Sequence, residues 1–540
     1  MSTAEAPWNG WAAGADRPSL SPRALRLLGD AVGSGVVAPD AQLDVLVAAA
    51  PAGRLPAHPL VDDAPEGRLR HAAGQSFADW VARRAGRLVA VPDGVAYPAD
   101  GDAVRDLLRY AAETGSVLIP YGGGTSVVGG VTPVRGDLPQ LTIDLRRLAG
   151  LRRLGASSGL ATFGAGTLGP AIEGALRERG WTLGHFPQSY ERSTLGGWVA
   201  TRSAGQQALG FGRIEDLFAG GTLEAPAGTV DLPAHPASAA GPDLRQLVLG
   251  SEGRLGVLTE VVVRAVPLPQ AEAMTAVFLP SWDAALTLAR DVVQARVPVT
   301  MIRVLSPAET EVTLALAGNS IGVALVTRYL GIRGLTGERS LMLVGFAGRR
   351  RIVDASRREV SELARSRGGI GVGSALATAW RRERFRSAGL RDALWAAGYG
   401  VDTIETATDW PRLTALQEKI EAAIAGAVAF GGERALAFSH VSHLYPTGAS
   451  LYVTAVFRLA ADPDETLERW RAIKAAASSA IVEHGATISH QHGVGRDHAP
   501  YLAAEKGALG MAILGDVARR LDPAGTMNPG VLLDTDPADR

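Results

Sequence analysis

Hydrophobic and polar positions follow two different rhythms along the chain, and glycine or proline separates most of the segments. Residues 103–114 carry four apolar side chains at helical spacing, and Gly115 follows them as a helix C-cap would. Residues 117–119 form a short apolar run that predicts a strand, which we expect to end at Pro120. By the same criteria the first half contains helices at residues 22–32, 76–84 and 168–179 and strands at residues 141–145, 160–163 and 255–266.

A second region, with its own alternation of helices and strands, begins after Pro269. Its predicted helices span residues 282–295, 353–366, 410–427 and 465–484, and its predicted strands span residues 299–304, 341–346, 435–439 and 451–457. A last helix is predicted at residues 508–521. The pattern therefore predicts an α+β chain in four parts: an N-terminal helical segment (1–85), a glycine-rich domain (86–270), a larger α+β domain (271–505) and a C-terminal helix and tail (506–540).

The composition excludes several classes of protein. The 540 residues include no cysteine, so the chain has no disulfide, no cysteine-based zinc or iron–sulfur site, no cysteine nucleophile and no cysteinyl link to a cofactor. The net charge of -1 provides no attraction for nucleic acid, and no nucleic-acid partner is predicted. The first residues lack the basic and apolar regions of a secretory signal, which predicts a cytoplasmic protein.

Glycine is unusually frequent, with 65 residues, and many of them cluster in loops. The segment PYGGGTSVVGG, residues 120–130, directly follows a predicted strand. Consecutive glycines let backbone N–H groups turn to one side and form a concave anion site, to which Thr125 and Ser126 add hydroxyl donors. This loop suits a pyrophosphate, although it lacks the Gly-Lys-Ser/Thr of a P-loop. The alternative is a glycine-rich hairpin without a ligand.

A second glycine pattern, Gly164-x-Gly166-x-x-Gly169, formally meets the description of a dinucleotide-binding Rossmann turn, with Glu191 as the acid that follows. The segment WTLGHFPQS at residues 181–189 is broken by glycine and proline, so it does not match the strand that should carry this acid. We therefore interpret the pattern as a structural tight turn.

Two further stretches, residues 188–217 and 250–260, are rich in small and polar residues. Each places glycines beside Ser or Thr and an acid, which allows a flat or phosphorylated ligand to approach the backbone closely. Together with the first loop they indicate a large cofactor that is held by several loops.

Half of the ten histidines lie within 59 residues of the C-terminal half: His440, His443, His490, His492 and His498. In an extended segment His490 and His492 would point to the same face, where two imidazoles serve as acid–base groups or as metal ligands. No HExxH spacing occurs and no Asp or Glu adjoins them, so we predict no metal.

Two polar side chains lie in predicted core strands. Tyr452 belongs to SLYVTAVF, where a buried tyrosine is typical of a protein core. Arg303 stands between Ile302 and Val304, and a charge at such a position needs a buried anion partner, which is either structural or functional.

The order of these motifs resembles that of a known superfamily. PYGGGTSVVGG, STLGGWVATRSAGQ, FGRIEDL and GSEGRLGVLTE follow one another as in the FAD-binding domain of the vanillyl-alcohol oxidase / p-cresol methylhydroxylase superfamily. PWNGW, PDGVAYP, GLRDALW, GASLYVTAVF and ISHQHGVG extend the likeness to the alkyldihydroxyacetonephosphate synthase (alkylglycerone-phosphate synthase) family within it. The resemblance implies an α+β fold with a PCMH-type two-subdomain FAD-binding domain over residues 86–270. It also implies a substrate-binding cap domain with a central antiparallel sheet over residues 271–505, and a C-terminal helix and tail that return to the FAD domain.

The resemblance also implies which residues would contact FAD. They lie on four segments and comprise Pro120, Tyr121, Gly122, Gly123, Gly124, Thr125 and Ser126; Gln188, Ser189, Tyr190, Glu191, Arg192, Ser193 and Thr194; Thr201, Arg202, Ser203 and Ala204; and Glu252, Gly253, Arg254, Leu255, Gly256, Val257 and Leu258. Since cysteine is absent and no histidine lies in the first loop, we predict that FAD is bound non-covalently.

By resemblance, the chain would exchange the acyl group of acyl-dihydroxyacetone phosphate for a fatty alcohol through an adduct at flavin N5. This exchange makes an ether lipid without net redox change. Tyr452 would be the proton acceptor and donor, and Arg303 and Arg391 would hold the anionic groups of a lipid-like substrate. His490 and His492 would line the site as acid–base groups.

The chain departs from the family at Gln491, which interrupts the family's run of three histidines. The alternative function is that of an FAD-linked D-2-hydroxyacid dehydrogenase or oxidase of the same superfamily. The corresponding metal-binding motifs have a glutamate where Gln491 stands and a second histidine near Tyr452. An amide does not replace the charge of a carboxylate on a divalent cation, which argues against this alternative. A third interpretation is a flavin-binding protein that is not an enzyme because its catalytic site has lost its activity.

Two basic runs, at residues 349–351 and 381–386, are interpreted as solvated helix faces. The alternative is docking onto a membrane surface. The sequence leaves open both this peripheral membrane contact and a homodimer.

Overall fold

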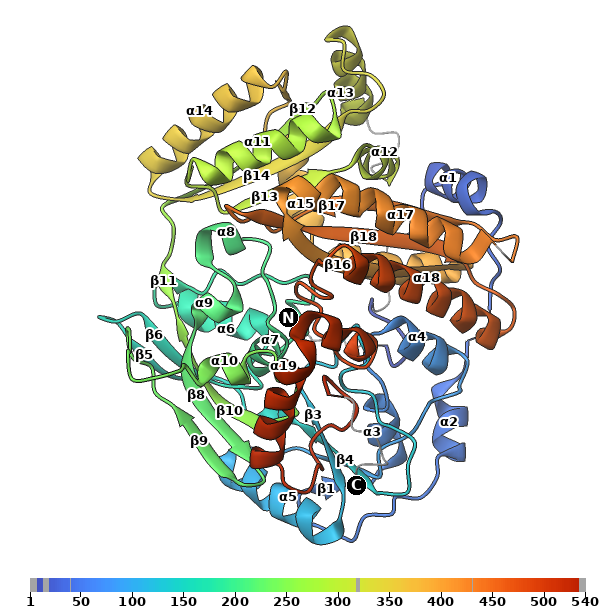
Figure 1. The fold of residues 1–540 in the computed structure, drawn as a ribbon, viewed down its shortest axis with the longest axis vertical. Coiled ribbons are helices and arrows are strands. Elements are labelled where there is room, and N and C mark those ends of the chain that lie inside the picture. Colours follow the sequence, from blue (N-terminus) through green and yellow to red (C-terminus); the bar gives the residue numbers. More distant parts are fainter. Residues whose placement is uncertain (1–6, 13–18, 39, 317–320, 430, 534–540) are drawn as a thin grey trace. The chain divides into compact units, whose positions relative to one another are not determined.

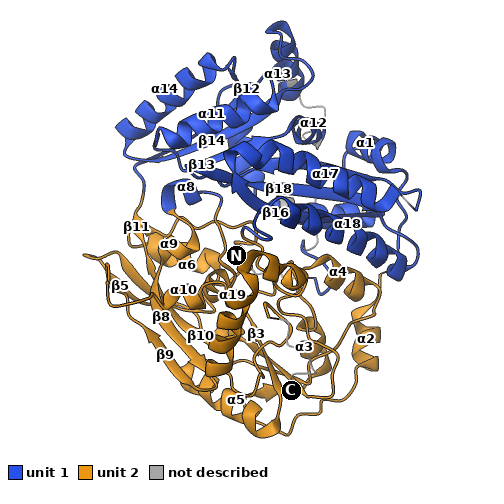
Figure 2. Cartoon of the chain, in the orientation of Figure 1, with its two compact units in different colours: residues 1–38, 206–211, 269–490 blue, residues 39–205, 212–268, 491–540 orange. Residues whose placement is uncertain are grey.

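The computed structural model describes residues 7–12, 19–38, 40–316, 321–429 and 431–533 (Figure 1). The chain divides into two compact units (Figure 2): unit 1 comprises residues 1–38, 206–211 and 269–490, and unit 2 comprises residues 39–205, 212–268 and 491–540. This division differs from the four predicted parts. The predicted N-terminal segment is shared between the units, and the chain returns to unit 2 at residue 491.

Unit 2 contains a four-stranded sheet in the order β1-β2-β4-β3. Its strands are β1 (Val61–Asp62), β2 (Gly94–Ala96), β3 (Val117–Tyr121) and β4 (Gln140–Asp144). β2, β4 and β3 run parallel, and β1 pairs with β2 antiparallel. The amphipathic helix α5 (Gly101–Thr114) contributes Leu107 and Leu108 to a core that also contains Leu118 and Leu141 of the sheet. The apolar face that predicted this helix is therefore the face that it buries.

The predicted end of strand β3 at Pro120 is wrong. The strand extends to Tyr121, and Pro120 pairs with Ile143 of β4. β3 is the edge strand of its sheet, where a proline without an N–H is tolerated because no further strand needs that donor.

The second sheet of unit 2 has the order β5-β6-β10-β8-β9, and all its pairs are antiparallel. Its strands are β5 (Leu151–Gly155), β6 (Leu160–Gly164), β8 (Phe218–Ala225), β9 (Gly228–Leu232) and β10 (Val257–Arg264). The Gly164–Gly169 pattern joins β6 to helix α6 (Gly169–Arg177), but β6 has no parallel neighbour, so no Rossmann unit exists there. A Cβ on Gly166 would lie 1.7 Å from the backbone oxygen of Leu145. The pattern is a structural tight turn, as interpreted from the sequence.

The remaining elements of unit 2 are short, except for one helix. They are α2 (Leu43–Ala49), α3 (Pro65–Arg70), α4 (Phe77–Arg84), α7 (Leu195–Thr201), α9 (Ile214–Leu217), α10 (Arg245–Val248), the strand pair β7 (Trp181–Thr182) and β11 (Val266–Pro267), and α19 (Ala499–Leu521). The long helix α19 is interrupted at Gly507, where φ is +69° and the backbone is not helical.

Unit 1 is built on a seven-stranded sheet in the order β15-β12-β14-β13-β17-β18-β16, in which every pair is antiparallel. Its strands are β12 (Ala271–Leu279), β13 (Met301–Leu305), β14 (Ser340–Gly348), β15 (Ile370–Gly371), β16 (Tyr399–Asp409), β17 (Ala435–Val441) and β18 (Gly448–Arg458). The central antiparallel sheet predicted for this part of the chain is confirmed.

The helices of unit 1 are α1 (Pro22–Val32), α8 (Ala208–Phe211), α11 (Trp282–Gln294), α12 (Pro307–Leu316), α13 (Ile321–Ile332), α14 (Arg350–Ser366), α15 (Ala375–Glu383), α16 (Leu390–Ala396), α17 (Leu413–Ala429) and α18 (Pro463–Glu483). Among the described residues of either unit, no helix is both long and apolar enough to cross a membrane.

Helices α17 and α18 lie on one face of the sheet. Ser439 of β17 donates a hydrogen bond to Glu421 of α17 at 2.5 Å, and Trp470 of α18 donates to Asp402 of β16 at 2.7 Å. Successive side chains of a strand alternate between the two faces of a sheet. Residues 440 and 405, which are an odd number of positions from Ser439 and Asp402, therefore point to the face away from these helices.

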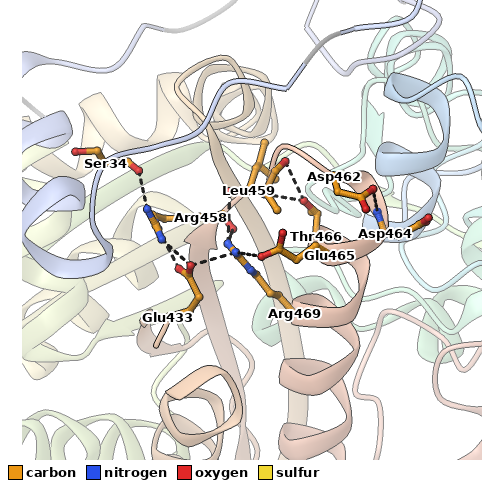
Figure 3. Close-up of polar contacts among 10 residues, drawn as sticks. Ser34, Glu433, Arg458, Leu459, Asp462, Asp464, Glu465, Thr466 and Arg469 are labelled. Atoms are coloured by element: carbon orange, nitrogen blue, oxygen red, sulfur yellow. Dashed lines mark hydrogen bonds and ion pairs between the residues drawn. The ribbon is translucent and has the colours of Figure 1, made fainter. Parts of the chain in front are cut away.

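A cluster of charged residues attaches the N-terminal part of unit 1 to this sheet (Figure 3). Glu433 accepts hydrogen bonds from Arg458 at the end of β18 and lies 3.1 Å from Arg469 of α18. Arg458 also donates to the backbone oxygen of Ser34 at 3.4 Å. The cluster therefore links three segments that are distant in sequence, with the carboxylate of Glu433 held between two guanidinium groups.

Candidate active site

Three polar side chains form a row across β17, β18 and β16, the last three strands of the unit 1 sheet. His440 of β17 pairs with Tyr452 of β18, and Tyr452 pairs with Glu405 of β16. Side chains directly opposite each other in an antiparallel pair lie on the same face of the sheet. The row thus lies on the face away from α17 and α18, on strands that the sheet fixes in register.

Arg303 of β13 lies beside this row, and Glu309 is the buried anion partner that the sequence required for it. Its Nη2 donates to Oε1 of Glu309 on α12 at 2.8 Å, and it lies 3.1 Å from Nδ1 of His440. Nδ1 of His440 in turn lies 2.8 Å from Oε2 of Glu309. Burial opposes ionisation of Glu309, but the neighbouring His440 and Arg303 outweigh it and lower the pKa of this carboxyl to about 2. A buried carboxylate thus holds both the guanidinium and the imidazole in place.

Tyr452 lies against His440, with ring centroids 4.6 Å apart and planes inclined by 22°. Burial raises the pKa of the Tyr452 hydroxyl, against a hydrogen bond with Thr403 that lowers it, and the charge of Glu405 adds to the increase. Burial also lowers the pKa of His440, and Arg303 contributes in the same direction. At neutral pH the site therefore presents a protonated phenol beside a neutral imidazole.

A second cluster begins at Glu405, at the other end of the row. Nδ1 of His490 lies 3.1 Å from Oε1 of Glu405, and Nε2 of His490 lies 2.6 Å from the hydroxyl of Tyr445. The ring of His443 is stacked on that of His490, with centroids 4.9 Å apart. Ligand atoms of Glu405, His443 and His490 all lie within 4.8 Å of one another, so this cluster has the geometry of a three-ligand cation site as well as that of a hydrogen-bonded chain.

The structure brings some of the predicted site residues together. Arg303 and Tyr452 both contact His440, and His490 contacts Glu405, the cross-strand neighbour of Tyr452. Arg391 lies on α16 of the same unit, whereas His492 belongs to unit 2. The roles of Arg391 and His492 stay predictions.

Sequence reasoning missed Glu309, Glu405 and Tyr445 and named His440 only as one of a group. Glu309 follows Arg303 by six residues, and the buried arginine did predict that some anion must be near it. Glu405 lies 85 residues from His490 and Tyr445 lies 45 residues from it, so only the folded sheet brings these residues together.

The four segments predicted to contact FAD meet in unit 2. A Cβ on Gly122 would lie 2.3 Å from Oγ1 of Thr194, and one on Gly123 would lie 1.8 Å from the backbone oxygen of Arg192. The first and second segments therefore touch backbone to backbone, which only glycine permits.

The fourth segment joins the third and the first. The N–H of Glu252 donates to the oxygen of Ala200, directly before the third segment, at 2.9 Å. Gly253, at φ +79°, packs its backbone against Pro120 of the first segment, where a Cβ would lie 3.0 Å from the proline ring. The four loops thus form one continuous group.

The side chain of Glu252 is buried and links this group to the C-terminal segment. It accepts hydrogen bonds from the backbone N–H groups of Val494 at 2.6 Å and Gly495 at 2.7 Å. Burial raises the pKa of Glu252 to about 7, although these two donors act in the opposite direction. Asn528 donates to the backbone oxygen of Glu252 at 2.8 Å and fixes the turn.

One buried nitrogen beside these loops fits a bound cofactor. Nε2 of His185 lies 3.2 Å from Oγ of Ser203, but its Nδ1 is buried without a hydrogen-bond partner in the described part of the chain. Burial lowers the pKa of His185 to about 3, and the charge of Arg213 contributes, so the ring is neutral. A buried polar atom that the protein leaves unsatisfied is expected to bind a ligand or water. The close-packed glycine loops and this nitrogen therefore suit a large, polar cofactor.

Comparison with known proteins agrees with this arrangement. An FAD binding domain family matches residues 92–231, and the family of FAD linked oxidases, C-terminal domain, matches residues 268–532. These matches confirm FAD as the cofactor and an FAD-dependent enzyme as the class. A solved structure of p-cresol methylhydroxylase with substrate bound shares the fold, with a TM-score of 0.69 at 12% identity over 93% of this chain and 100% of that one.

Two comparisons concern the same enzyme. Alkyldihydroxyacetonephosphate synthase from Dictyostelium discoideum is 30% identical over 475 residues, which cover 87% of this chain and 77% of that protein. A solved structure of alkyldihydroxyacetonephosphate synthase matches with a TM-score of 0.82 and 26% identity over 97% of this chain and 98% of that one. The chain therefore belongs to the alkyldihydroxyacetonephosphate synthase family.

Proposed function

We propose that this protein exchanges the acyl group of an acyl-dihydroxyacetone phosphate for a fatty alcohol, with FAD as a non-covalent cofactor. The observation that carries the proposal is the group of Arg303, His440 and Tyr452 on one face of the unit 1 sheet, in a chain of this family. An anion-binding cation beside a buried hydroxyl suits a phosphorylated substrate whose reaction requires a proton to move.

Arg303 has a donor available for the substrate. Its Nη2 contacts Glu309 and His440, but its Nε is buried without a hydrogen-bond partner among the described residues. An unsatisfied guanidinium N–H in a buried position favours binding of a phosphate oxygen. Glu309 keeps the guanidinium plane fixed, so the substrate binds to an arginine that is already oriented.

Tyr452 is the proton donor and acceptor of this proposal. Because its pKa is raised, the hydroxyl is protonated at neutral pH and begins the reaction as a donor. The stack on His440 and the strand register fix the phenol ring, and the neutral His440 adds no charge that would favour the phenolate. FAD, when bound, supplies an electrophilic ring system, and the overall exchange is redox-neutral.

Incubation of the purified holoenzyme with palmitoyl-dihydroxyacetone phosphate and labelled hexadecanol tests the proposal. We expect labelled ether lipid and one equivalent of released palmitate. Arg303→Lys is the informative variant, because it keeps the charge but loses the planar donors, and KM for the phosphorylated substrate should rise at least about tenfold. Absence of exchange by the wild-type protein would contradict the proposal.

The cation geometry of Glu405, His443 and His490 favours a second candidate, an FAD-linked D-2-hydroxyacid dehydrogenase. Anaerobic addition of a panel of D-2-hydroxy acids distinguishes the two functions. The dehydrogenase would bleach the flavin absorbance, whereas the exchange reaction would leave the flavin oxidised at the end of turnover.

A further inference from the structure

His71 lies at the end of helix α3 in unit 2, and each of its two ring nitrogens faces an oxygen atom. Nδ1 lies 2.7 Å from the backbone oxygen of Gly67 in α3, and Nε2 lies 2.9 Å from Oδ2 of Asp144 at the end of β4. The side chains of His71 and Asp144 are 5% and 0% exposed. The ring is therefore buried and is held at both ends.

The chemistry of these two partners determines the protonation of the ring. A backbone carbonyl and an ionised carboxylate only accept hydrogen bonds, so both nitrogens of His71 must carry a proton. Burial opposes ionisation of Asp144, but hydrogen bonds from His71 and Arg146 outweigh it and lower the pKa of this carboxyl. His71 also caps the C-terminus of α3, where a positive charge is favoured. The ring is thus a buried imidazolium.

The charges around His71 do not cancel. Arg146 donates to Oδ1 of Asp144 through its backbone N–H at 3.0 Å and to Oδ2 through its Nε at 2.9 Å, so one carboxylate faces two cations. The other neighbours are the rings of Tyr97 and Tyr121, with centroids 5.9 and 4.6 Å from that of His71. Burial raises the pKa of both phenols, so they are neutral. The three ionised side chains therefore carry one positive charge in excess.

Tyr121 connects His71 to the first cofactor loop. It is the last residue of β3, it pairs with Asp144 of β4, and it directly precedes the three glycines at residues 122–124. A Cβ added to Gly124, where φ is +66°, would lie 2.0 Å from the hydroxyl oxygen of Tyr121. The phenol is therefore packed directly against the backbone of the loop. The imidazolium contacts one ring, and that ring contacts the loop.

A positive charge at this place matches the chemistry of the cofactor. FAD contains a pyrophosphate, which is negatively charged, and consecutive backbone N–H groups of a glycine loop form a concave site for such a group. A buried cation behind the loop acts where little water screens it, so its attraction for an anion is stronger than that of a surface histidine. The hydrogen bonds at both ends of the ring keep this charge in place.

We propose that His71, as a buried imidazolium, is a positioning residue of the first cofactor loop and favours binding of the FAD pyrophosphate there. His71 acts through Tyr121, which transmits its position to Gly124, and through its charge. Asp144 keeps the ring protonated and oriented. The inference rests on FAD as the cofactor and on the first loop as part of its site, and it is independent of the exchange reaction.

Titration of the apoprotein with FAD, followed by flavin fluorescence, tests the proposal in two variants of His71. His71→Gln removes the charge, and we expect the dissociation constant for FAD to rise at least about tenfold at pH 7. His71→Lys keeps a positive charge with several donors, and its dissociation constant should stay within about threefold of the wild type. Wild-type affinity in His71→Gln would overturn the proposal. Equal losses in both variants would also overturn it, because packing rather than charge would then be responsible.

His58 provides a matched control in the same unit. Its Nε2 lies 3.3 Å from Asp106 and its ring lies 4.6 Å from that of Tyr110, so it has the same kinds of neighbour as His71. These neighbours belong to α5 and not to a cofactor loop. His58→Gln should therefore bind FAD as the wild type does. If His58→Gln weakens FAD binding as much as His71→Gln, the effect is not specific to the loop and the proposal is wrong.

A measurement on the wild-type protein does not depend on how the variants fold. In holoenzyme labelled with ¹⁵N-histidine, with His71 assigned by comparison with His71→Lys, long-range ¹H–¹⁵N spectra at pH 7 should show protons on both ring nitrogens. A ring with one proton would overturn the proposal. A wild-type protein that makes no ether lipid would contradict the proposed function and leave this inference intact. Loss of FAD affinity in Gly123→Ala but not in His71→Gln would confirm the loop and exclude the role of His71.

Discussion

The imidazole of His440 is stacked on the phenol of Tyr452, and the two residues are direct cross-strand neighbours on β17 and β18. Through its Nδ1, His440 also contacts both Arg303 and Glu309. The stack therefore connects the residue that we propose to bind the substrate phosphate with the residue that we propose to move a proton.

Replacement of Tyr452 by phenylalanine removes a hydroxyl and keeps the stacked ring. We expect Tyr452→Phe to lower kcat for the exchange at least about a hundredfold, the usual contribution of a positioned acid–base group. Flavin content should be unchanged, and the melting temperature should fall by only a few degrees, because the ring packing is kept and one hydrogen bond with Thr403 is lost. Steady-state kinetics and flavin absorbance check this, and an enzyme that retains its kcat would contradict the role of Tyr452.

Glu309 is expected to stabilise the fold only while it is ionised. Its pKa is lowered to about 2, so the unfolded chain takes up a proton first as the pH falls below 4.5. The stabilisation is present above pH 4.5 and is lost as the pH falls toward 2. Urea unfolding between pH 7 and pH 3 should show a decline that is weaker in Glu309→Gln. At pH 7 this variant should be destabilised by about 3–5 kcal/mol, because it leaves a charged Arg303 without its buried partner.

Glu252 should have the opposite pH dependence. Its pKa is raised to about 7, so between pH 4.5 and pH 7 the folded protein keeps a proton that the unfolded chain has released. The stabilisation is present below pH 4.5 and is lost as the pH rises through about 7. Free energies of unfolding at pH 5, 6, 7 and 8 should decline more steeply for the wild type than for Glu252→Gln. Equal slopes in the two proteins would show that Glu252 is ionised throughout this range.

Gly123 is the most tightly enclosed glycine of the first cofactor loop. Gly123→Ala would place a Cβ 1.8 Å from the backbone oxygen of Arg192, so the first and second loops must separate. We expect the dissociation constant for FAD to rise at least about tenfold, with a lower melting temperature. Gly136→Ala, at a glycine with no atom within 4 Å of the added Cβ, is the matched control. Equal FAD affinities of the two variants, measured by flavin fluorescence titration, would contradict this role of the loop.

Acid precipitation tests the prediction that the flavin is non-covalent. The holoenzyme should show absorbance bands near ~370 and ~450 nm, and after precipitation both should remain in the supernatant. A yellow pellet would show a covalent bond to a side chain, and since the chain contains no cysteine, a histidine or tyrosine would have to supply it.

Several helices and apolar strands could be predicted from the sequence to within a few residues where one face carries the apolar side chains, but strand β12 was not predicted and α19 begins nine residues before its predicted start. Helix α1 was predicted at its observed bounds, and α11 differs from its prediction by one residue, because each buries a stripe of period 3.6. Strand β16 was not predicted. Its sequence YGVDTIETATD places polar residues on both faces of the strand. Asp402 accepts a hydrogen bond from Trp470 of α18 on one face, and Glu405 contacts His490 on the other. A strand with functional polar residues loses the hydrophobic signal that would reveal it.

The cofactor loops could be named from motif order, but the hydrogen-bonding partners of the site residues could not. Gly122 and Gly123 are conspicuous in sequence because close backbone approach demands glycine itself. Glu309 and Tyr445 belong to no recognisable sequence motif. They are identified as site residues only by their contacts in the fold, Glu309 with Arg303 and Tyr445 with His490. Arg303 did indicate a nearby anion, because an unpaired charge on a core strand would be strongly destabilising.

The short connection from β17 to β18 has a consequence for how this chain tolerates change. His440 lies in β17 before this connection, Tyr452 lies in β18 after it, and Tyr445 lies within it. A single inserted or deleted residue there would slip β18 by one position and turn Tyr452 toward the face that α18 covers. In chains of common descent the exposed Thr447 should vary freely in identity, while the number of residues between His440 and Tyr452 stays constant. The length of this connection, rather than any one side chain in it, then keeps the Arg303–His440–Tyr452 cluster beside the Glu405–His490 cluster.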